Sequence, residues 1–131
     1  MAERLHVELV AADRTVWSGE ATIVIARTTE GEIGILPGHM PVMSLLVDGI
    51  VEIRTPEGEY CVAAADSGFL SVAHDRVSIL AEHAEMSSEI DIAQAKRDLE
   101  RAHEAGEGDD PEQRAAIRRA EARIRAFERA S

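Results

Sequence analysis

Hydrophobic and polar residues follow two different patterns along this chain, and the change falls near Met86. Before that point, short segments alternate apolar with polar residues or are rich in β-branched side chains, as Leu5, Val7 and Leu9 illustrate. The other segments that we expect to form strands are 23–25, 50–53, 60–63, 69–72 and 77–80. Glycine and proline predict turns at 18–19, 30–31, 37–38, 48–49, 56–58 and 67–68. Turns at intervals of about 10 residues are typical of a sandwich or barrel.

From Ser87 onward the apolar residues recur every three to four positions, which predicts two helices. Glycine and proline are absent from 87–105 and again from 112–131. The two apolar stripes consist of Ile92, Ala95, Leu99 and Ala102, and of Ile117, Ala120, Ile124 and Phe127. Between the helices, GEGDDP at 106–111 places glycine after the first helix and an Asp-Pro start before the second. So short a loop predicts an antiparallel hairpin.

The predicted fold class is therefore an N-terminal antiparallel β-sandwich followed by a C-terminal antiparallel two-helix hairpin. We expect the sandwich to occupy residues 1–86 and the hairpin residues 87–131. Alanine fills most of the two helical stripes, so the hairpin has little large apolar surface to bury. Because ordering two helices costs conformational entropy, we expect this hairpin to dock reversibly on another surface.

Charge and cysteine content restrict the class of partner. The chain has 14 basic and 25 acidic side chains, and its net charge of -11 disfavours binding to nucleic acid or anionic lipid. We find no apolar signal core in the first ten residues and no apolar run of about 20 residues, so we expect a soluble, unexported chain. Cys61 is the only cysteine, which fits a reducing cytoplasm, and we expect it to be a small buried hydrophobe.

Catalytic, metal and cofactor sites are not predicted by any motif in the chain. The glycine-rich segment GEIGILPGH at 31–39 lacks the lysine and hydroxyl of a phosphate-binding loop, so its glycines are expected to serve turns. The five histidines are scattered and lack the short spacing of a zinc site. No GxSxG element surrounds Ser67 or Ser71. An interaction module is the interpretation that remains.

The second predicted helix is basic in an otherwise acidic chain. The same segment contains three glutamates and six arginines, which are Arg114, Arg118, Arg119, Arg123, Arg125 and Arg129. Two interpretations remain open at this point. The arginines either form a solvated face with Glu–Arg pairs of small energetic value, or they bind an acidic protein partner.

The segment GEIGILPGHMP at 31–41 resembles the GExGILPGHxP segment of the bacterial and chloroplast ATP synthase epsilon family. Other similar segments follow in the same order along the chain, at 17–19, 68–72, 77–80, 84–85 and 90–91. The resemblance covers essentially the whole chain. It implies a non-catalytic rotor subunit of a proton-translocating F-type ATP synthase, at the cytoplasmic face of the bacterial plasma membrane.

In that family the sandwich lies beside the gamma subunit and on the c ring. The resemblance therefore implies c-ring contacts by the loop 30–41, through Glu30, Glu32, His39 and Met40. It also implies that the hairpin either folds onto the sandwich or extends into the catalytic alpha/beta head, where it obstructs ATP hydrolysis. In the extended position, the residues expected to face the beta subunits are Arg114, Arg118, Arg119, Arg123 and Arg125.

Some family members bind ATP on the folded hairpin through an [IL]DxxRA motif. The matching residues here are Glu85, Ile90, Asp91, Ala95 and Arg101. Gln94 replaces the motif's arginine and removes a fixed charge, so we predict weak ATP binding at most. In the competing interpretation, Asp91 caps a helix and Gln94 closes a capping box. A free-standing adaptor protein is the main alternative to the whole assignment, and co-purification with gamma would separate the two.

Overall fold

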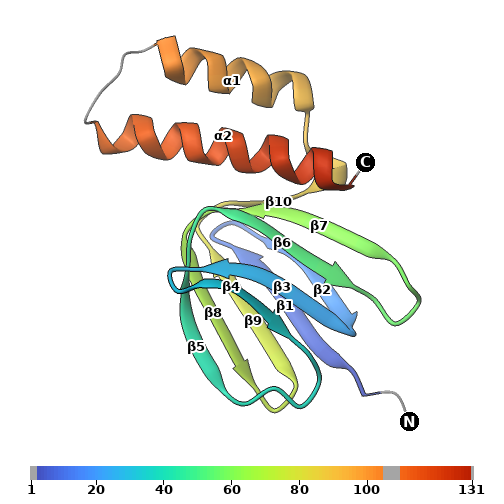
Figure 1. The fold of residues 1–131 in the computed structure, drawn as a ribbon. Helices are drawn as coiled ribbons and strands as arrows, with labels where there is room; N and C mark the ends of the chain where they lie inside the picture. Colours follow the sequence, from blue (N-terminus) through green and yellow to red (C-terminus); the bar gives the residue numbers. More distant parts are fainter. Residues whose placement is uncertain (1–2, 105–109, 131) are drawn as a thin grey trace.

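The computed structural model describes residues 3–104 and 110–130, which form ten strands and then two helices (Figure 1). The strands are β1 Leu5–Ala11, β2 Thr15–Ala21, β3 Ile23–Thr28, β4 Gly31–Ile35, β5 Val42–Leu46, β6 Gly49–Arg54, β7 Tyr60–Ala65, β8 Gly68–Ala73, β9 Arg76–Ala81 and β10 Ala84–Met86. A 3-10 turn, Ser87–Glu89, precedes the helices α1 Ile92–Glu104 and α2 Pro111–Ala130. The predicted sandwich and hairpin are both confirmed.

The strands form one strongly curled sheet in the order β10-β7-β6-β3-β5-β8-β9-β1-β2, with β4 paired to β3. Its two end strands, β2 and β10, contact each other, so the sheet nearly closes around one core. Among the described pairings, β1 with β9 is parallel and all the others are antiparallel. The antiparallel description from the sequence therefore holds except at this junction, where the first strand joins the ninth.

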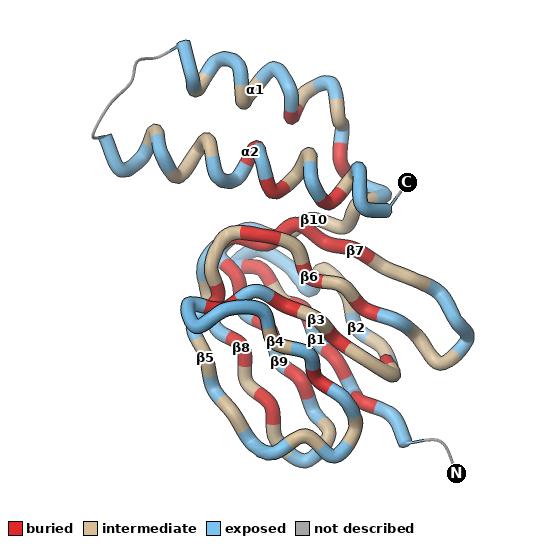
Figure 2. The backbone as a smooth tube through the Cα atoms, in the orientation of Figure 1, coloured by how far each residue is buried: buried red, intermediate tan, exposed pale blue. Residues whose placement is uncertain are grey.

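The core is built by the alternation that the sequence predicts. Leu5, Val7 and Leu9 of β1 are fully buried, and Val77 and Ile79 of β9 lie in the same cluster. Their neighbours along each strand point outward, so buried and exposed segments alternate along the tube in Figure 2. Six strands predicted from the sequence, β1, β3, β6, β7, β8 and β9, lie where the alternation places them.

Four strands were not predicted: β2, β4, β5 and β10. The turn expected at 18–19 is wrong, because both residues lie within β2. Gly19 serves packing instead, since a Cβ there would come within 3.0 Å of the Trp17 ring. The glycines at 31–34 also lie in a strand, β4, although Gly31 adopts a φ of 117° at the turn that begins it.

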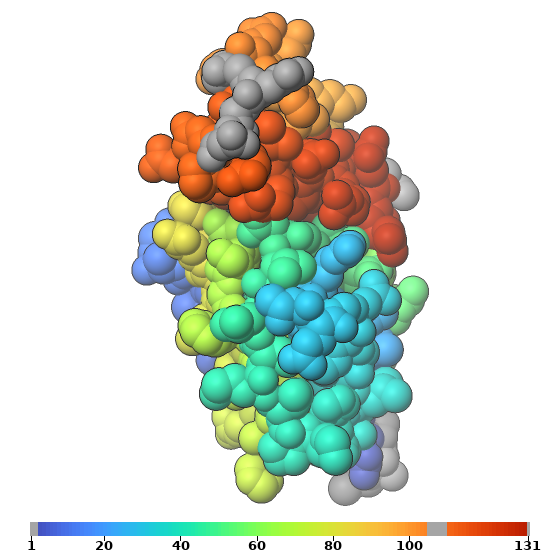
Figure 3. Space-filling view, turned by 60° about the vertical axis from the view of Figure 1, so that its left-hand side comes forward, coloured from blue at the N-terminus to red at the C-terminus, as the bar shows by residue number. Residues whose placement is uncertain are grey.

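Helix α2 lies on the outer face of β6 and β7, and α1 packs on α2 farther from the sandwich (Figures 1 and 3). Strand β7 is consequently buried on both faces: Ala63 and Ala65 face the main core, whereas Val62 and Ala64 face the helix. No helix within the described residues has both the length and the apolar character needed to span a membrane.

The face of α2 that meets β7 differs from the stripe predicted for this helix. Ala122 and Ala126 join Val62, Ala64 and Ile90 in a second small core. Of the predicted stripe, Phe127 is partly buried against this second core, and Ala120 is buried outside it. A single narrow stripe is therefore an incomplete description, because alanines give little contrast in a periodicity analysis.

Candidate functional site

The contact between α2 and the sandwich combines this alanine-rich core with three ion pairs along the helix. Arg118 Nε lies 2.9 Å from Asp48 Oδ2, in the loop before β6. Arg123 Nε lies 2.8 Å from Glu85 Oε1 on β10. Arg129 Nη1 lies 3.2 Å from Glu52 Oε1 on β6. Ion pairs thus fix the helix to the sandwich from Arg118 to Arg129, over the second and third thirds of its length.

Glu52 also accepts a hydrogen bond from the hydroxyl of Tyr60. Burial, followed by this hydrogen bond, raises the pKa of Tyr60 above its ordinary value, so the hydroxyl remains a donor at neutral pH. The acidic sandwich and the basic helix therefore interact within one chain. Neither of the two interpretations of the arginines includes this pairing between sandwich and hairpin.

The five arginines predicted to face the beta subunits occupy different positions in the docked hairpin. Arg118 and Arg123 face sandwich carboxylates. Arg119 and Arg125 line cavities between α2 and the sandwich, and Arg114 lies on the exposed surface of α2. Contact of these side chains with beta subunits stays a prediction, and for Arg118 and Arg123 it requires that the hairpin leave the sandwich.

The first helix begins later than the sequence suggests, at Ile92 instead of near Ser87. Residues Ser87–Glu89 form a separate 3-10 turn, in which the Glu89 carboxylate accepts the Met86 N–H at 3.1 Å. Arg14 also donates to Glu89, at 3.1 Å, and this hydrogen bond is the main cause that lowers the pKa of Glu89. The turn thus ties the start of the hairpin to the β1–β2 connection.

Asp91 caps α1, as the competing interpretation expects: its Oδ1 accepts the Gln94 N–H at 3.1 Å, and its carbonyl accepts the Ala95 N–H at 2.9 Å. The predicted capping box is wrong in its other half. The Gln94 side chain donates to Asp98 at 2.8 Å and accepts from Arg97 at 2.9 Å, so it points along the helix and not back to its start. Asp110 likewise caps α2 through the Glu112 N–H, at 3.0 Å.

Of the remaining residues of the predicted nucleotide motif, Glu85 and Arg101 line one groove, whereas Ile90 and Ala95 are buried outside it. Glu85 pairs with Arg123, Ile90 is buried in the second core, and Arg101 is exposed and lies 3.8 Å from Asp98. A groove of about 960 Å³ runs along the hairpin and is lined by three arginines and four carboxylates. Its lining residues that carry charge are Arg101, Arg119, Arg123, Glu85, Asp98, Asp110 and Glu112. The carboxylates offset the arginines, which disfavours a triphosphate.

We therefore expect isothermal titration of the unchanged chain with ATP to show no micromolar binding. Gln94→Arg, which restores the guanidinium that the motif carries, is the matched variant and should tighten binding by about tenfold. Micromolar binding by the unchanged chain would contradict this prediction. Equal dissociation constants for the two chains would show that position 94 does not limit the affinity for ATP.

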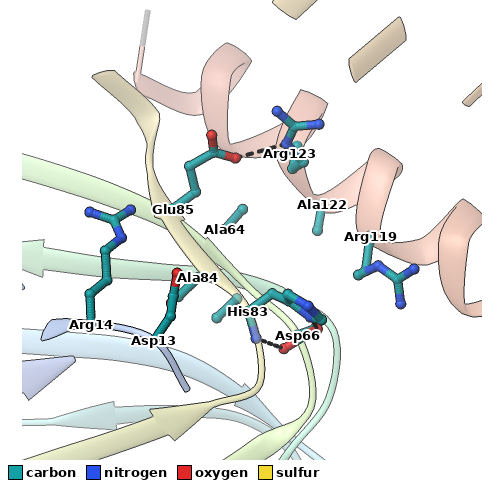
Figure 4. A pocket seen from close by; sticks show the side chains of 11 residues that line it. Asp13, Arg14, Ala64, Asp66, His83, Ala84, Glu85, Arg119, Ala122 and Arg123 are labelled. Carbon is teal, nitrogen blue, oxygen red and sulfur yellow. Dashed lines mark hydrogen bonds and ion pairs between the residues drawn. The ribbon is translucent and has the colours of Figure 1, made fainter. Parts of the chain in front are cut away.

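A smaller cavity of about 270 Å³ lies between β10 and α2 (Figure 4). At its edge, buried Asp66 accepts the His83 N–H at 2.6 Å and lies 2.7 Å from His83 Nδ1. Possible ligand atoms of Asp66, Glu82 and His83 lie within 4.8 Å of one another, a grouping not foreseen from the sequence. The backbone N–H and the ring of His83 already occupy both carboxylate oxygens of Asp66. These contacts therefore stabilise the corner between β9 and β10.

The residues predicted to contact the c ring are exposed or half-buried, but they do not share one loop. Glu30 lies in the β3–β4 turn, and Glu32 lies on β4. His39 and Met40 follow the far end of β4, where Met40 is 73% exposed. Gly38 shapes this second loop with a φ of 87° and donates its N–H to Asp75 at 2.7 Å. The predicted contact therefore consists of two patches separated by a strand.

A surface that the sequence analysis missed is the outer face of β5, β8 and β9. Leu45, Phe69 and Leu80 are direct cross-strand neighbours there and are 51–52% exposed, and Met43 adds a further exposed side chain. No described helix covers this face, whereas α2 covers the face of β6 and β7 (Figure 3). We call Met43, Leu45, Phe69 and Leu80 the apolar row. A sequence cue exists, because pairs of consecutive large apolar residues at 45–46, 69–70 and 79–80 break the alternation.

A bare apolar face beside a helical hairpin held by ion pairs is typical of a protein that binds other proteins. The family described as "ATP synthase, Delta/Epsilon chain, beta-sandwich domain" matches residues 4–87. The ATP synthase epsilon chain of Streptomyces avermitilis is 55% identical over 96% of this chain and 97% of its own. The Rhodococcus jostii epsilon chain is 53% identical over 99% of this chain and 100% of its own. The chain belongs to the ATP synthase epsilon chain family.

Solved structures agree with this assignment. A chain in the Euglena gracilis mitochondrial ATP synthase, solved with OSCP, F1 and c-ring, superposes with a TM-score of 0.71 and 26% identity, covering 95% of this chain and 78% of that one. A chain of the Tetrahymena thermophila central stalk and c-ring shares the fold, with a TM-score of 0.61 and 15% identity over 98% and 96%. The expectation of a non-catalytic subunit is confirmed by the epsilon-chain relatives. As an ATP synthase subunit, the chain is membrane-associated.

Proposed function

We propose that this chain is a central-stalk subunit that joins gamma to the c ring of a proton-translocating ATP synthase at the cytoplasmic face of the plasma membrane. We further propose a division of labour in which residues 1–86 bind the stalk and residues 87–131 regulate ATP hydrolysis. The observation that carries the proposal is the apolar row, because it is a large uncovered surface on an otherwise highly charged chain.

The apolar row is the part of the surface that fits gamma. Three of its side chains form a continuous line across β5, β8 and β9, and such a line is flat and rigid because the strands fix its register. A surface of this kind suits a permanent partner, since obligate interfaces are more apolar than transient ones. The hairpin lies on β6 and β7, so it leaves the row accessible in the docked state.

The two patches at the ends of β4 fit the c ring. Leu36 and Met40 are 56% and 73% exposed, and Gly38 and its hydrogen bond to Asp75 hold their loop in one shape. Glu30 and Glu32 add exposed carboxylates near the other end of the strand. An apolar contact flanked by carboxylates would hold amide or basic groups of ring loops and transmit torque without any chemistry.

The hairpin has the properties expected of a movable brake. Its contact with the sandwich is built mainly from alanines, which bury little area, and from ion pairs that water can replace. Two arrangements separated by a few kcal/mol are what a population shift requires. Release would also free Arg118 and Arg123 for acidic helices of the beta subunits.

Deletion of residues 87–131 from the assembled complex tests the brake. We expect ATP hydrolysis to rise several-fold, because the obstructing helices are gone, while the sandwich keeps its place on gamma. The measurement is steady-state hydrolysis per assembled complex, with co-purification of the shortened chain as the control for assembly. Unchanged hydrolysis in a complex that retains the shortened chain would remove the inhibitory role.

A further inference from the structure

Arg123 is the described residue through which the sandwich and both helices meet by ion pairs. From α2 it reaches Glu85 on β10 with Nε at 2.8 Å, and it reaches Asp98 on α1 with Nη1 at 3.4 Å. Its side chain is 24% exposed, whereas those of Arg118 and Arg129 are 54% and 53% exposed. Their carboxylate partners show the reverse order, since Glu85 is 29% exposed whereas Asp48 and Glu52 are 10% and 12% exposed, so the link to α1 and not burial distinguishes the Arg123 pair.

The two carboxylates use different nitrogens of the guanidinium, so they do not compete for one hydrogen. Holding Nη1 on Asp98 fixes the rotation of the Arg123 side chain and so presents Nε to Glu85. Asp98 is in turn oriented by α1 itself, because its other oxygen, Oδ1, accepts the Gln94 side-chain N–H at 2.8 Å. A continuous polar path thus leads from Gln94 through Asp98 and Arg123 to Glu85.

We propose that this path couples the pairing of α1 with α2 to the docking of α2 on the sandwich, so that the loss of either contact weakens the other. Asp98 and Gln94 act as positioning residues, since neither has a hydrogen bond or ion pair to the sandwich among the described contacts. Gln94 therefore has a role of its own in this chain, independent of any ligand. The proposal concerns the chain by itself and stands whether or not the hairpin controls hydrolysis.

The two pairs on either side of Arg123 along α2 provide the contrast. Arg118 with Asp48 and Arg129 with Glu52 connect α2 to the sandwich directly, and no described ion pair links either of them to α1. Removing Asp48 should weaken docking without any dependence on Asp98. Removing Glu85 should weaken docking and, at the same time, cancel the contribution of Asp98.

Hydrogen exchange of the full-length chain measures how strongly α2 docks on the sandwich, because the amides of residues 120–127 exchange when the hairpin opens. We expect Glu85→Gln and Asp98→Asn each to speed this exchange by about fivefold, as the loss of one partly exposed ion pair predicts. The α2 amides of the variant that combines Glu85→Gln with Asp98→Asn should exchange no faster than those of the faster single variant. Asp98→Asn combined with Asp48→Asn should multiply to about 25-fold, because independent effects add as free energies.

Two controls test whether the substitutions unfold the sandwich or disturb α1 in a general way. Exchange of the core amides of β8 and β9 should not change in any variant, which shows that the sandwich stays folded. Arg101→Gln, which removes an exposed partner of Asp98 at 3.8 Å, should leave α2 exchange at the level of the unchanged chain. The proposal is overturned if Asp98→Asn has no effect on α2, or if its effect multiplies fully with that of Glu85→Gln.

Discussion

Replacing Gly68 with alanine is expected to lower the free energy of unfolding of the sandwich by about 3 kcal/mol or more. A Cβ at this position would lie 1.8 Å from the Leu80 carbonyl oxygen and 2.9 Å from the Ala81 Cα. These are backbone atoms of β9, which pairs directly with β8, so the clash cannot be relieved by moving a side chain. The strands would have to separate at the point where the β7–β8 connection enters the sheet.

Urea unfolding followed by the fluorescence of Trp17, the single tryptophan, measures this loss within the sandwich. The matched control is Gly34→Ala, since a Cβ there meets no atom within 4 Å. That variant should unfold within about 1 kcal/mol of the unchanged chain. Similar midpoints for the two variants would show that β8 and β9 are not as closely apposed as the geometry requires.

The second large effect is expected on binding, where Phe69→Asp should weaken association with gamma by about 100-fold, or roughly 2.7 kcal/mol. Phe69 stands in the middle of the apolar row, between Leu45 and Leu80, and is the only aromatic residue of the row. An aspartate there would bury a charge without a partner in the interface. Because Phe69 is 51% exposed in the free chain, the substitution should leave the fold intact.

Titration calorimetry with purified gamma measures the loss, and Trp17 fluorescence confirms that the variant is folded. Ala93→Asp introduces the same charge at an exposed position on α1 and should bind gamma as the unchanged chain does. If Phe69→Asp binds normally, the apolar row is not the docking face for gamma. If the unchanged chain itself fails to bind gamma, the proposed contact between this chain and gamma is wrong.

The sequence predicts those parts of the fold that follow from local alternation and from strong helix boundaries. Asp110-Pro111 begins α2 as predicted, and the alternation at Leu5–Leu9 identifies β1. Local alternation does not predict β4 and β5, because two glycines interrupt the first and consecutive apolar residues occur in the second. Their strand conformation depends on neighbours far along the chain, which a local pattern does not contain.

The candidate site shows the same division more sharply. The capping role of Asp91 is local and was predicted, whereas the pairs that fix the hairpin join residues 38 to 77 positions apart. Net charge suggests that an acidic sandwich and a basic helix could attract each other. It does not tell which carboxylate meets which arginine, because that depends on the curl of the sheet and the angle of α2 across it.

The parallel pairing of β1 with β9 has a consequence for the order of events on the ribosome. His6 pairs with Arg76, so the apolar face of the first strand waits for 70 further residues before its central partner exists. At about 5–20 residues per second this interval lasts roughly 4–14 s, during which β2 is the only neighbour available to β1. The pairing of β1 with β9 therefore completes late in synthesis, and the residues of the hairpin follow β9 and are made after it.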